Sequence, residues 1–249
     1  MLAVILAAGF GSRLGHITQK VPKALISVGN KPLLVRNIEI LRDEGVNKFV
    51  IVTGYKSVKL RKRIKRTFPD LNISFVHNYH YRDTNNIFSL YIAAKDIKEK
   101  FIILNSDIIF HRSILKKLLK LDSENLTISV DFRDTIGEEE MKVKVDGDKV
   151  VRISKKIDPK EADGEYIGLA KVSEKAVEDL KRSLEETMRR KGKGVFYEEV
   201  FQHMIDNGKV VNYTSTSGLP WTEIDTPDDL KFAREVVYPR ILELESENS

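Results

Sequence analysis

A wholly apolar segment that runs straight into a glycine-rich loop limits the fold more than any other feature of this chain. Residues 2–7 (LAVILA) carry no polar side chain, which is typical of a strand buried on both faces of a sheet. Glycines follow at positions 9, 11 and 15. Glycine tolerates positive φ, and successive backbone N–H groups in such a turn form a concave site for an anion. The segment therefore predicts a buried first strand that ends in a phosphate-binding loop.

Two basic residues beside the glycines strengthen this interpretation. Arg13 offers a guanidinium fork that matches phosphate oxygens, and Lys23 follows Pro22, which predicts extended chain at this point. No lysine–serine pair completes a Walker A loop after these glycines, and the third glycine comes one residue late for the dinucleotide fingerprint. The His-Arg-Asp element of kinases is absent as well. From the glycines alone, a strand–helix turn without a ligand remains the alternative.

Composition excludes several kinds of chemistry. The chain has 249 residues, enough for one large α/β domain, and it contains no cysteine, so disulfides and thiolate catalysis are excluded. Charged residues make up 32% of the chain, and lysine and glutamate are abundant among them. This composition is typical of thermophile proteins. The net charge of +5 suits an enzyme that handles triphosphates. Because no apolar run reaches membrane-spanning length and no signal peptide is visible, we expect a cytoplasmic protein.

The order of the expected elements predicts an α/β fold. Strand-like apolar segments, each followed by a helical pattern, lie at 2–7, 49–53, 72–77 and 101–104. This alternation predicts a Rossmann-like, mostly parallel sheet flanked by helices. Beyond residue 125, short alternating segments predict an antiparallel extension, with strands at 128–132, 141–145, 149–153 and 166–172. Helices are expected at 56–66, at 173–190, at 196–206 and at 226–245. In the first of these, Val58 is expected to face inward, and Ser173 is expected to cap the second. Residues 245–249 are expected to fray.

Two aspartates are candidate metal ligands. Asp107 follows the strand at 101–104, and ligands of open parallel sheets bind at the carboxyl ends of the strands. A carboxylate there suits Mg²⁺, which takes one or two protein carboxylates and completes its shell with phosphates and water. Asp225 precedes a helix start. A turn aspartate at 107 and an acid favoured by the helix dipole at 225 are the alternatives, and position alone does not decide between them.

Three motifs resemble the signature of the nucleoside-triphosphate transferase superfamily. They are LAAGFGSRL at 6–14, PKAL at 22–25 and KPLL at 31–34. Enzymes of this family join a nucleoside monophosphate to a phosphorylated small molecule and release pyrophosphate. The resemblance implies Mg²⁺ at Asp107 and Asp225, which occupy the two positions where the family has metal-binding aspartates. It also implies catalytic roles for Arg13 on the leaving phosphates and for Lys23 on the attacking or α-phosphate.

Further motifs resemble the cytidylyltransferases that act on phosphocholine, aminoethylphosphonate or inositol 1-phosphate. These motifs are Asn78-x-x-Tyr81, NNIxSL at 85–90 and WTEID at 221–225. They imply CTP as the nucleotide. The residues implied in nucleotide binding are Leu6, Ala8, Gly9, Gly11, Ser12, Gly54, Tyr55, Asn86 and Ser89. For the asparagines at 85 and 86, a helix cap is the alternative.

The acceptor is the least constrained part of the prediction. A quaternary ammonium needs an aromatic cage with a carboxylate, which Tyr166, Tyr197, Trp221 and Glu198 could supply as acceptor-binding residues. Core packing is favoured for at least two of these aromatics. A polyol phosphate needs hydrogen-bonding groups instead. The thermophile-like composition favours inositol 1-phosphate, because the enzyme acting on it belongs largely to heat-loving microbes, and phosphocholine ranks second.

Together these features predict one nucleotidyltransferase domain over residues 1–249. Its expected parts are a nucleotide-binding part at about 1–125, an acceptor-binding part at about 126–225 and a C-terminal helix at 226–245. The expected partners are CTP and a small phosphate monoester, without nucleic acid or membrane insertion, in a monomer or homodimer whose product can feed a membrane enzyme. The alternatives are a sugar-1-phosphate nucleotidyltransferase, a nucleotide-sensing module without catalysis, and a nucleic-acid-binding protein that uses the basic segment 56–66. For that segment a solvated helix face is favoured.

Overall fold

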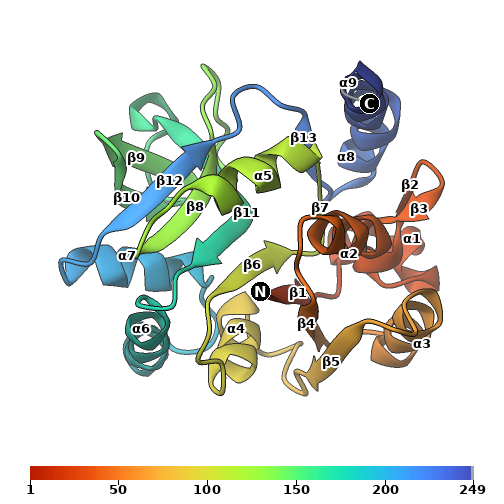
Figure 1. Ribbon diagram of the computed structural model, residues 1–249, viewed down its shortest axis with the longest axis horizontal. Coiled ribbons are helices and arrows are strands. Elements are labelled where there is room, and N and C mark those ends of the chain that lie inside the picture. Colours follow the sequence, from red (N-terminus) through yellow and green to blue (C-terminus); the bar gives the residue numbers. More distant parts are fainter. Residues whose placement is uncertain (248–249) are drawn as a thin grey trace.

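Nine strands form one continuous sheet within residues 1–247, the part of the chain that the computed structural model describes (Figure 1). Their order across the sheet is β5-β4-β1-β6-β11-β8-β12-β10-β9. Their bounds are β1 Leu2–Ala7, β4 Lys48–Thr53, β5 Asn72–His77, β6 Phe101–Asn105, β8 Leu126–Asp131, β9 Lys142–Asp146, β10 Lys149–Ser154, β11 Gly164–Val172 and β12 Val211–Ser215. The strands predicted from the sequence are confirmed, with ends that differ by a few residues.

The first half of the sheet is parallel. β1 pairs in parallel with β4 on one side and with β6 on the other, and β4 pairs with β5. The chain therefore builds outward from β1 to β5 and then returns to the far side of β1. In open α/β sheets, ligands bind at the carboxyl ends of the strands where the order reverses in this way. In this sheet that place is the junction of β1 and β6.

The second half continues the same sheet with mostly antiparallel strands. β11 runs antiparallel to β6 and β8, whereas β12 returns in parallel to β8. The register of β11 shifts between Tyr166 and Ala170, around Gly168, which has φ +83°. A Cβ at Gly168 would collide with the side chain of Asn105, so glycine is required where β11 crosses the end of β6.

Helices cover both faces of the sheet (Figure 1). Their bounds are α1 His16–Lys20, α2 Leu33–Asp43, α3 Ser57–Thr67, α4 Asn86–Ala94, α5 Arg112–Lys120, α6 Val177–Lys191, α7 Glu198–Asp206, α8 Pro227–Phe232 and α9 Tyr238–Glu247. Alternate residues of β1 explain its apolar sequence: Val4 and Leu6 pack with α4, α6 and α7, whereas Ala3 and Ile5 pack with α2, α3 and α5. No helix within residues 1–247 combines the length and apolarity that crossing a membrane requires.

Two small ribbons and the C-terminal helices form a third packing unit. β7 (Ile108–Phe110) pairs with β13 (Trp221–Glu223), and β2 (Ser27–Val28) pairs with β3 (Lys31–Pro32). Thr226 and Asp229 form a reciprocal capping box at the start of α8, where the sequence predicts the start of a helix. A separate apolar cluster joins α8 and α9 to these ribbons and to the first loop.

Four local expectations were wrong. Lys23 begins a 3-10 turn, Lys23–Leu25, because only Pro22 before it is extended. Val58 is 80% exposed, because the buried side of α3 is made by Leu60 and Ile64. Ser173 closes a local turn onto the N–H of Ala176, so α6 starts only at Val177.

The fourth error concerns the C-terminal helix. A π-helical turn, Ala233–Val237, interrupts it before Pro239, and α9 then continues to Glu247. Residues 245–247 are therefore helical rather than frayed. The rest of that expectation, residues 248 and 249, lies outside the described residues.

Candidate active site

A cleft of about 650 Å³ lies at the carboxyl ends of β1 and β6. Most of the residues predicted for the site line it. They are Leu6, Ala8, Gly9, Gly11, Ser12, Arg13, Lys23, Asn86, Ser89, Asp107, Tyr166, Glu198, Trp221 and Asp225. Some of these residues, such as Arg13 and Asp225, are 212 positions apart in the sequence, and the fold brings them to one edge of the sheet.

Three carboxylates meet in this cleft. Asp107, Glu223 and Asp225 each place a carboxylate oxygen within 4.8 Å of the other two. The β7–β13 ribbon causes this meeting, because Glu223 pairs with Ile108 and the N–H of Ile224 donates to the carbonyl of Asp107 at 3.0 Å. Sequence reasoning found the two aspartates but missed Glu223. The signal was present, since residues 223 and 225 are two apart on an extended segment and therefore face the same side.

Two cations neutralise the carboxylates. The Lys23 ammonium lies 2.6 Å from Asp107 Oδ2 and also forms an ion pair with Asp225, and Arg13 pairs with Asp225 from the cleft surface. Burial alone would lower the pKa of Lys23. The charges of Asp107, Asp225 and Glu223 outweigh that effect and raise its pKa above the ordinary value. Lys23 is therefore a fixed positive charge in the cleft at any physiological pH.

The chemistry of the carboxylates fits a divalent cation such as Mg²⁺. Asp107 Oδ1 is buried and has no hydrogen-bond partner among the described residues, although a buried carboxylate oxygen normally has one. Desolvation of its carboxyl group in the cleft, together with the charges of Asp107 and Asp225, raises the pKa of Glu223 above its ordinary value, although the residue as a whole is exposed. Crowded carboxylates with an unpaired oxygen are the donor set that a hard cation accepts.

The predicted base-binding residues fall into two groups. Leu6, Ala8, Asn86 and Ser89 line the cleft, whereas Gly54 and Tyr55 lie behind its wall. There Tyr55 donates its N–H to the carbonyl of Ala8 at 3.1 Å. A Cβ at Gly54 would lie 2.5 Å from that same carbonyl oxygen, so glycine permits this close approach. These two residues therefore hold the first loop against the turn after β4.

Two of the predicted acceptor residues, Tyr166 and Tyr197, are packed in the core, although Tyr166 also lines the cleft. Tyr197 is fully buried and does not line the cleft, and its hydroxyl lies 2.8 Å from that of Tyr166 and 3.2 Å from Asn105 Oδ1. Both tyrosines belong to the core cluster that includes Phe201. Burial raises their pKa values well above the ordinary value. The expectation that at least two of the aromatics are core residues is therefore confirmed.

Trp221 and Glu198 do line the cleft, at the end that the sequence predicts to hold the acceptor. The Arg133 guanidinium lies over the ring of Trp221, 5.7 Å from its centroid. Glu198 is 5% exposed, and its Oε2 atom has no hydrogen-bond partner among the described residues. Burial raises the pKa of Glu198 to about 7. This end of the cleft therefore contains a carboxyl group that is ready to exchange hydrogen bonds with a ligand.

Sequence reasoning missed one wall of the cleft. The segment 133–141 contributes Arg133, Glu139, Glu140 and Met141, and Lys155 lies close by, with its Nζ 3.9 Å from Glu139 Oε2. No motif marks this segment. Its position depends on how β8, β9 and β11 pair in the antiparallel half of the sheet.

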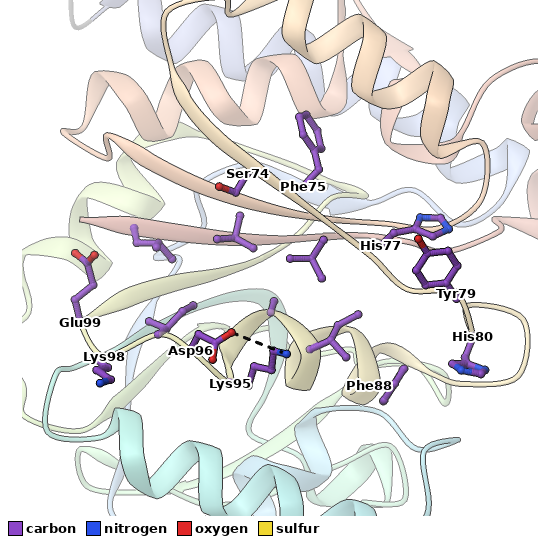
Figure 2. Close-up of a pocket in the computed structure, with 16 residues that line it drawn as sticks. Ser74, Phe75, His77, Tyr79, His80, Phe88, Lys95, Asp96, Lys98 and Glu99 are labelled. Atoms are coloured by element: carbon purple, nitrogen blue, oxygen red, sulfur yellow. Dashed lines mark ion pairs between the residues drawn. The ribbon is translucent and has the colours of Figure 1, made fainter.

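A larger cavity of about 960 Å³ lies elsewhere, between β5 and α4 (Figure 2). Its lining is mainly apolar, with His77, Tyr79 and His80 at one end and the Lys95–Asp96 ion pair towards the other. It contains none of the residues predicted for the site and none of the three clustered carboxylates. Its size alone does not make it the catalytic site.

A glycine loop and two cations beside a carboxylate cluster, at the switch point of a parallel sheet, define a protein that binds phosphorylated ligands. The family model described as "Nucleotidyl transferase" matches residues 2–237, and the chain belongs to this family. Relatives that are more similar in sequence bear on which nucleotide and which acceptor such a protein uses.

Two curated relatives are similar to this chain in sequence. The Bifunctional IPC transferase and DIPP synthase of Aquifex aeolicus is 30% identical over 240 residues, which cover 94% of this chain and 51% of the relative. A Choline-phosphate cytidylyltransferase of Streptococcus pneumoniae is 37% identical over 103 residues, 41% of this chain and 43% of the relative. The chain therefore spans about half the length of these curated relatives.

Solved structures agree with the fold. The inositol-1-phosphate CTP transferase from T. maritima superimposes with a TM-score of 0.82 at 25% identity, covering 98% of this chain and 96% of that one. The CTP:phosphocholine cytidylyltransferase from Streptococcus pneumoniae superimposes with a TM-score of 0.79 at 25% identity, covering 94% and 98%. The α/β fold predicted from the sequence is confirmed.

Proposed function

We propose that the protein is a cytidylyltransferase that transfers CMP from CTP to inositol 1-phosphate, giving CDP-inositol and pyrophosphate. The observation that carries the proposal is the position of Asp107, Glu223 and Asp225 around Lys23, next to the glycine loop. Similarity to an inositol-1-phosphate CTP transferase along nearly the whole chain supports the choice of substrates.

The reaction joins two anions, so charge neutralisation and alignment dominate the catalysis. An oxygen of the acceptor's phosphate monoester attacks the α-phosphorus of CTP, the bond from that phosphorus to the bridging oxygen breaks, and pyrophosphate leaves. Lys23 and Arg13 supply positive charge beside the reacting phosphates, and the N–H groups around Gly9 and Gly11 hold the triphosphate. No proton needs to be transferred by a histidine.

Asp107 and Asp225, with Glu223 beside them, are the residues that would hold Mg²⁺. When bound, the ion supplies Lewis-acid stabilisation of the phosphoryl oxygens and a template for the two substrates. The carboxylates in turn would lower the mobility of Lys23, whose ammonium they already hold. This cofactor role is a proposal that metal-binding measurements can test.

The state of the three predicted cage aromatics supports a polyol acceptor over a quaternary ammonium. An aromatic cage must present open ring faces to the cation. Tyr197 is fully buried, Tyr166 is 3% exposed, and the ring of Trp221 already has the Arg133 guanidinium over it. Carboxyl groups remain available at this end of the cleft, among them Glu198 and Glu140, and these accept hydrogen bonds from hydroxyl groups.

Phosphocholine is the second candidate acceptor, because two structural or sequence relatives carry that activity in their names. Pyrophosphate release with CTP and Mg²⁺ distinguishes the two, with inositol 1-phosphate and phosphocholine tested side by side. Turnover with inositol 1-phosphate alone supports the proposal, and turnover with phosphocholine alone reverses the order. Turnover only with a sugar 1-phosphate and another nucleoside triphosphate would refute the cytidylyl assignment.

A further inference from the structure

A buried lysine near the acceptor end of the cleft is bonded only to backbone carbonyls among the described residues. Lys142, the first residue of β9, is 0% exposed. Its Nζ donates to the carbonyl oxygens of Gly137, Glu138 and Glu140 at 3.2, 2.7 and 3.4 Å. An ammonium group has three N–H donors, so the preceding loop uses all of them. A charge this buried is tolerated only while those carbonyls stay in place.

These carbonyls belong to the segment 133–141, which forms one wall of the cleft. Glu139, Glu140 and Met141 of this segment line the cleft, on the side where Lys155 approaches. The conformation of the segment therefore decides which side chains face a molecule bound beyond the acidic cluster.

Both ends of the segment 133–141 are held at the same residue of β11, Glu165. Lys142 at its end lies opposite Glu165 in the β9–β11 pairing. Arg133 at its start forms an ion pair with the same Glu165. The two ends are thus held together by strand pairing and charge, and the Lys142 ammonium bonds to three carbonyls of the turn between them.

We propose that Lys142 is a positioning residue for the acceptor substrate. Its ammonium group folds the segment 133–141 so that the carboxylates of Glu139 and Glu140 lie at the acceptor end of the cleft, where they accept hydrogen bonds from the acceptor's hydroxyl groups. Lys142 itself acts through the segment and touches no substrate. The inference rests on the proposed transfer reaction and adds to it the residue that shapes the acceptor wall.

Initial rates of pyrophosphate release test this role, with CTP and inositol 1-phosphate varied in turn. If wild-type protein turns over phosphocholine alone, whose choline group has no hydroxyl, the inference is wrong. Lys142→Met keeps the length of the side chain and removes its donors. We expect it to raise the acceptor KM at least tenfold and to change the KM for CTP less than twofold. Lys142→Arg restores donors and charge, and we expect its acceptor KM to lie between those of the wild type and Lys142→Met.

Lys171→Met is the matched control. Lys171 is also a buried lysine, 7% exposed, and its ammonium donates to a backbone carbonyl, that of Leu121. It does not line the cleft. We expect this variant to lose stability while both KM values stay at the wild-type level, which separates positioning from general stabilisation.

The inference is wrong if Lys142→Met leaves the acceptor KM unchanged, or if both KM values rise together. If that variant does not fold, Gly137→Ala decides, because its added Cβ would displace the Glu140 carboxylate, one of the two groups that Lys142 is proposed to position, while Lys142 remains. A rise in acceptor KM supports the inference, and an unchanged value overturns it. If wild-type protein turns over neither acceptor, the proposed function fails first, and the inference falls with it.

Discussion

The buried carboxyl group of Glu198 makes a quantitative prediction about stability and pH. Burial raises its pKa from 4.5 to about 7 in the folded protein. Between these two pH values the folded protein keeps the proton and the unfolded chain has lost it. Each pKa unit corresponds to about 1.4 kcal/mol, so ionisation of Glu198 costs the folded state ~3 kcal/mol once the pH exceeds 7.

The sign follows from proton binding. Because the folded pKa is the higher one, the stabilising contribution of the neutral carboxyl is complete below about pH 4.5 and is lost as the pH rises through 7. Glu198→Gln keeps the shape and cannot ionise. We therefore expect the variant to have about the wild-type free energy of unfolding at pH 4.5 and to exceed it by ~3 kcal/mol at pH 8.

Urea unfolding followed by tryptophan fluorescence at pH 4.5, 6, 7 and 8 measures this difference. Other titrating groups are common to both proteins and cancel in the comparison. Glu199→Gln is the control for loss of a charge on the same helix turn, because Glu199 is partly exposed and pairs with Lys191 at 2.6 Å. A difference between wild type and Glu198→Gln that stays constant from pH 4.5 to 8 would refute the reasoning.

Three further substitutions test the site. Asp107→Ala is expected to abolish turnover and Mg²⁺ binding while circular dichroism shows an intact fold; near-wild-type turnover would remove the metal role. Arg13→Ala is expected to lower kcat/KM by more than tenfold, or about 1.4 kcal/mol, and a smaller loss would make it a positioning residue. Gly54→Ala places a Cβ 2.5 Å from the Ala8 carbonyl oxygen. We expect it to raise the KM for CTP and to lower the free energy of unfolding in urea by roughly 1–3 kcal/mol. Unchanged values would contradict this close approach.

Local sequence patterns were sufficient for the parallel half of the fold. The residues of β1 alternate between two apolar clusters, so a continuous apolar run could mean only a strand covered on both faces. The same reasoning located Asp107, because it lies two residues beyond the end of such a strand. These predictions needed only periodicity and the rule that ligands bind at strand ends.

Residues whose role depends on distant pairing could not be found in this way. Glu223 joins the two aspartates only because β13 pairs with β7, more than one hundred residues earlier in the chain. Lys142 stands in an alternating strand where a lysine normally marks the solvent face, and its burial follows from the loop that folds over it. Gly54 and Tyr55 were predicted to bind the nucleotide, but neither lines the cleft, and Tyr55 contacts the backbone of the first loop at Ala8.

The third apolar cluster explains how segments so far apart form one precise site. Leu14, Ile109 and Ile224 are all fully buried in it, next to or two residues from Arg13, Asp107 and Asp225. The C-terminal helices close the cluster through residues such as Ile241. Each charged group of the site is therefore anchored by a neighbouring apolar side chain in a common core. Because close-packed interiors transmit small displacements, the geometry of the carboxylates also depends on α9, none of whose described residues lines the cleft.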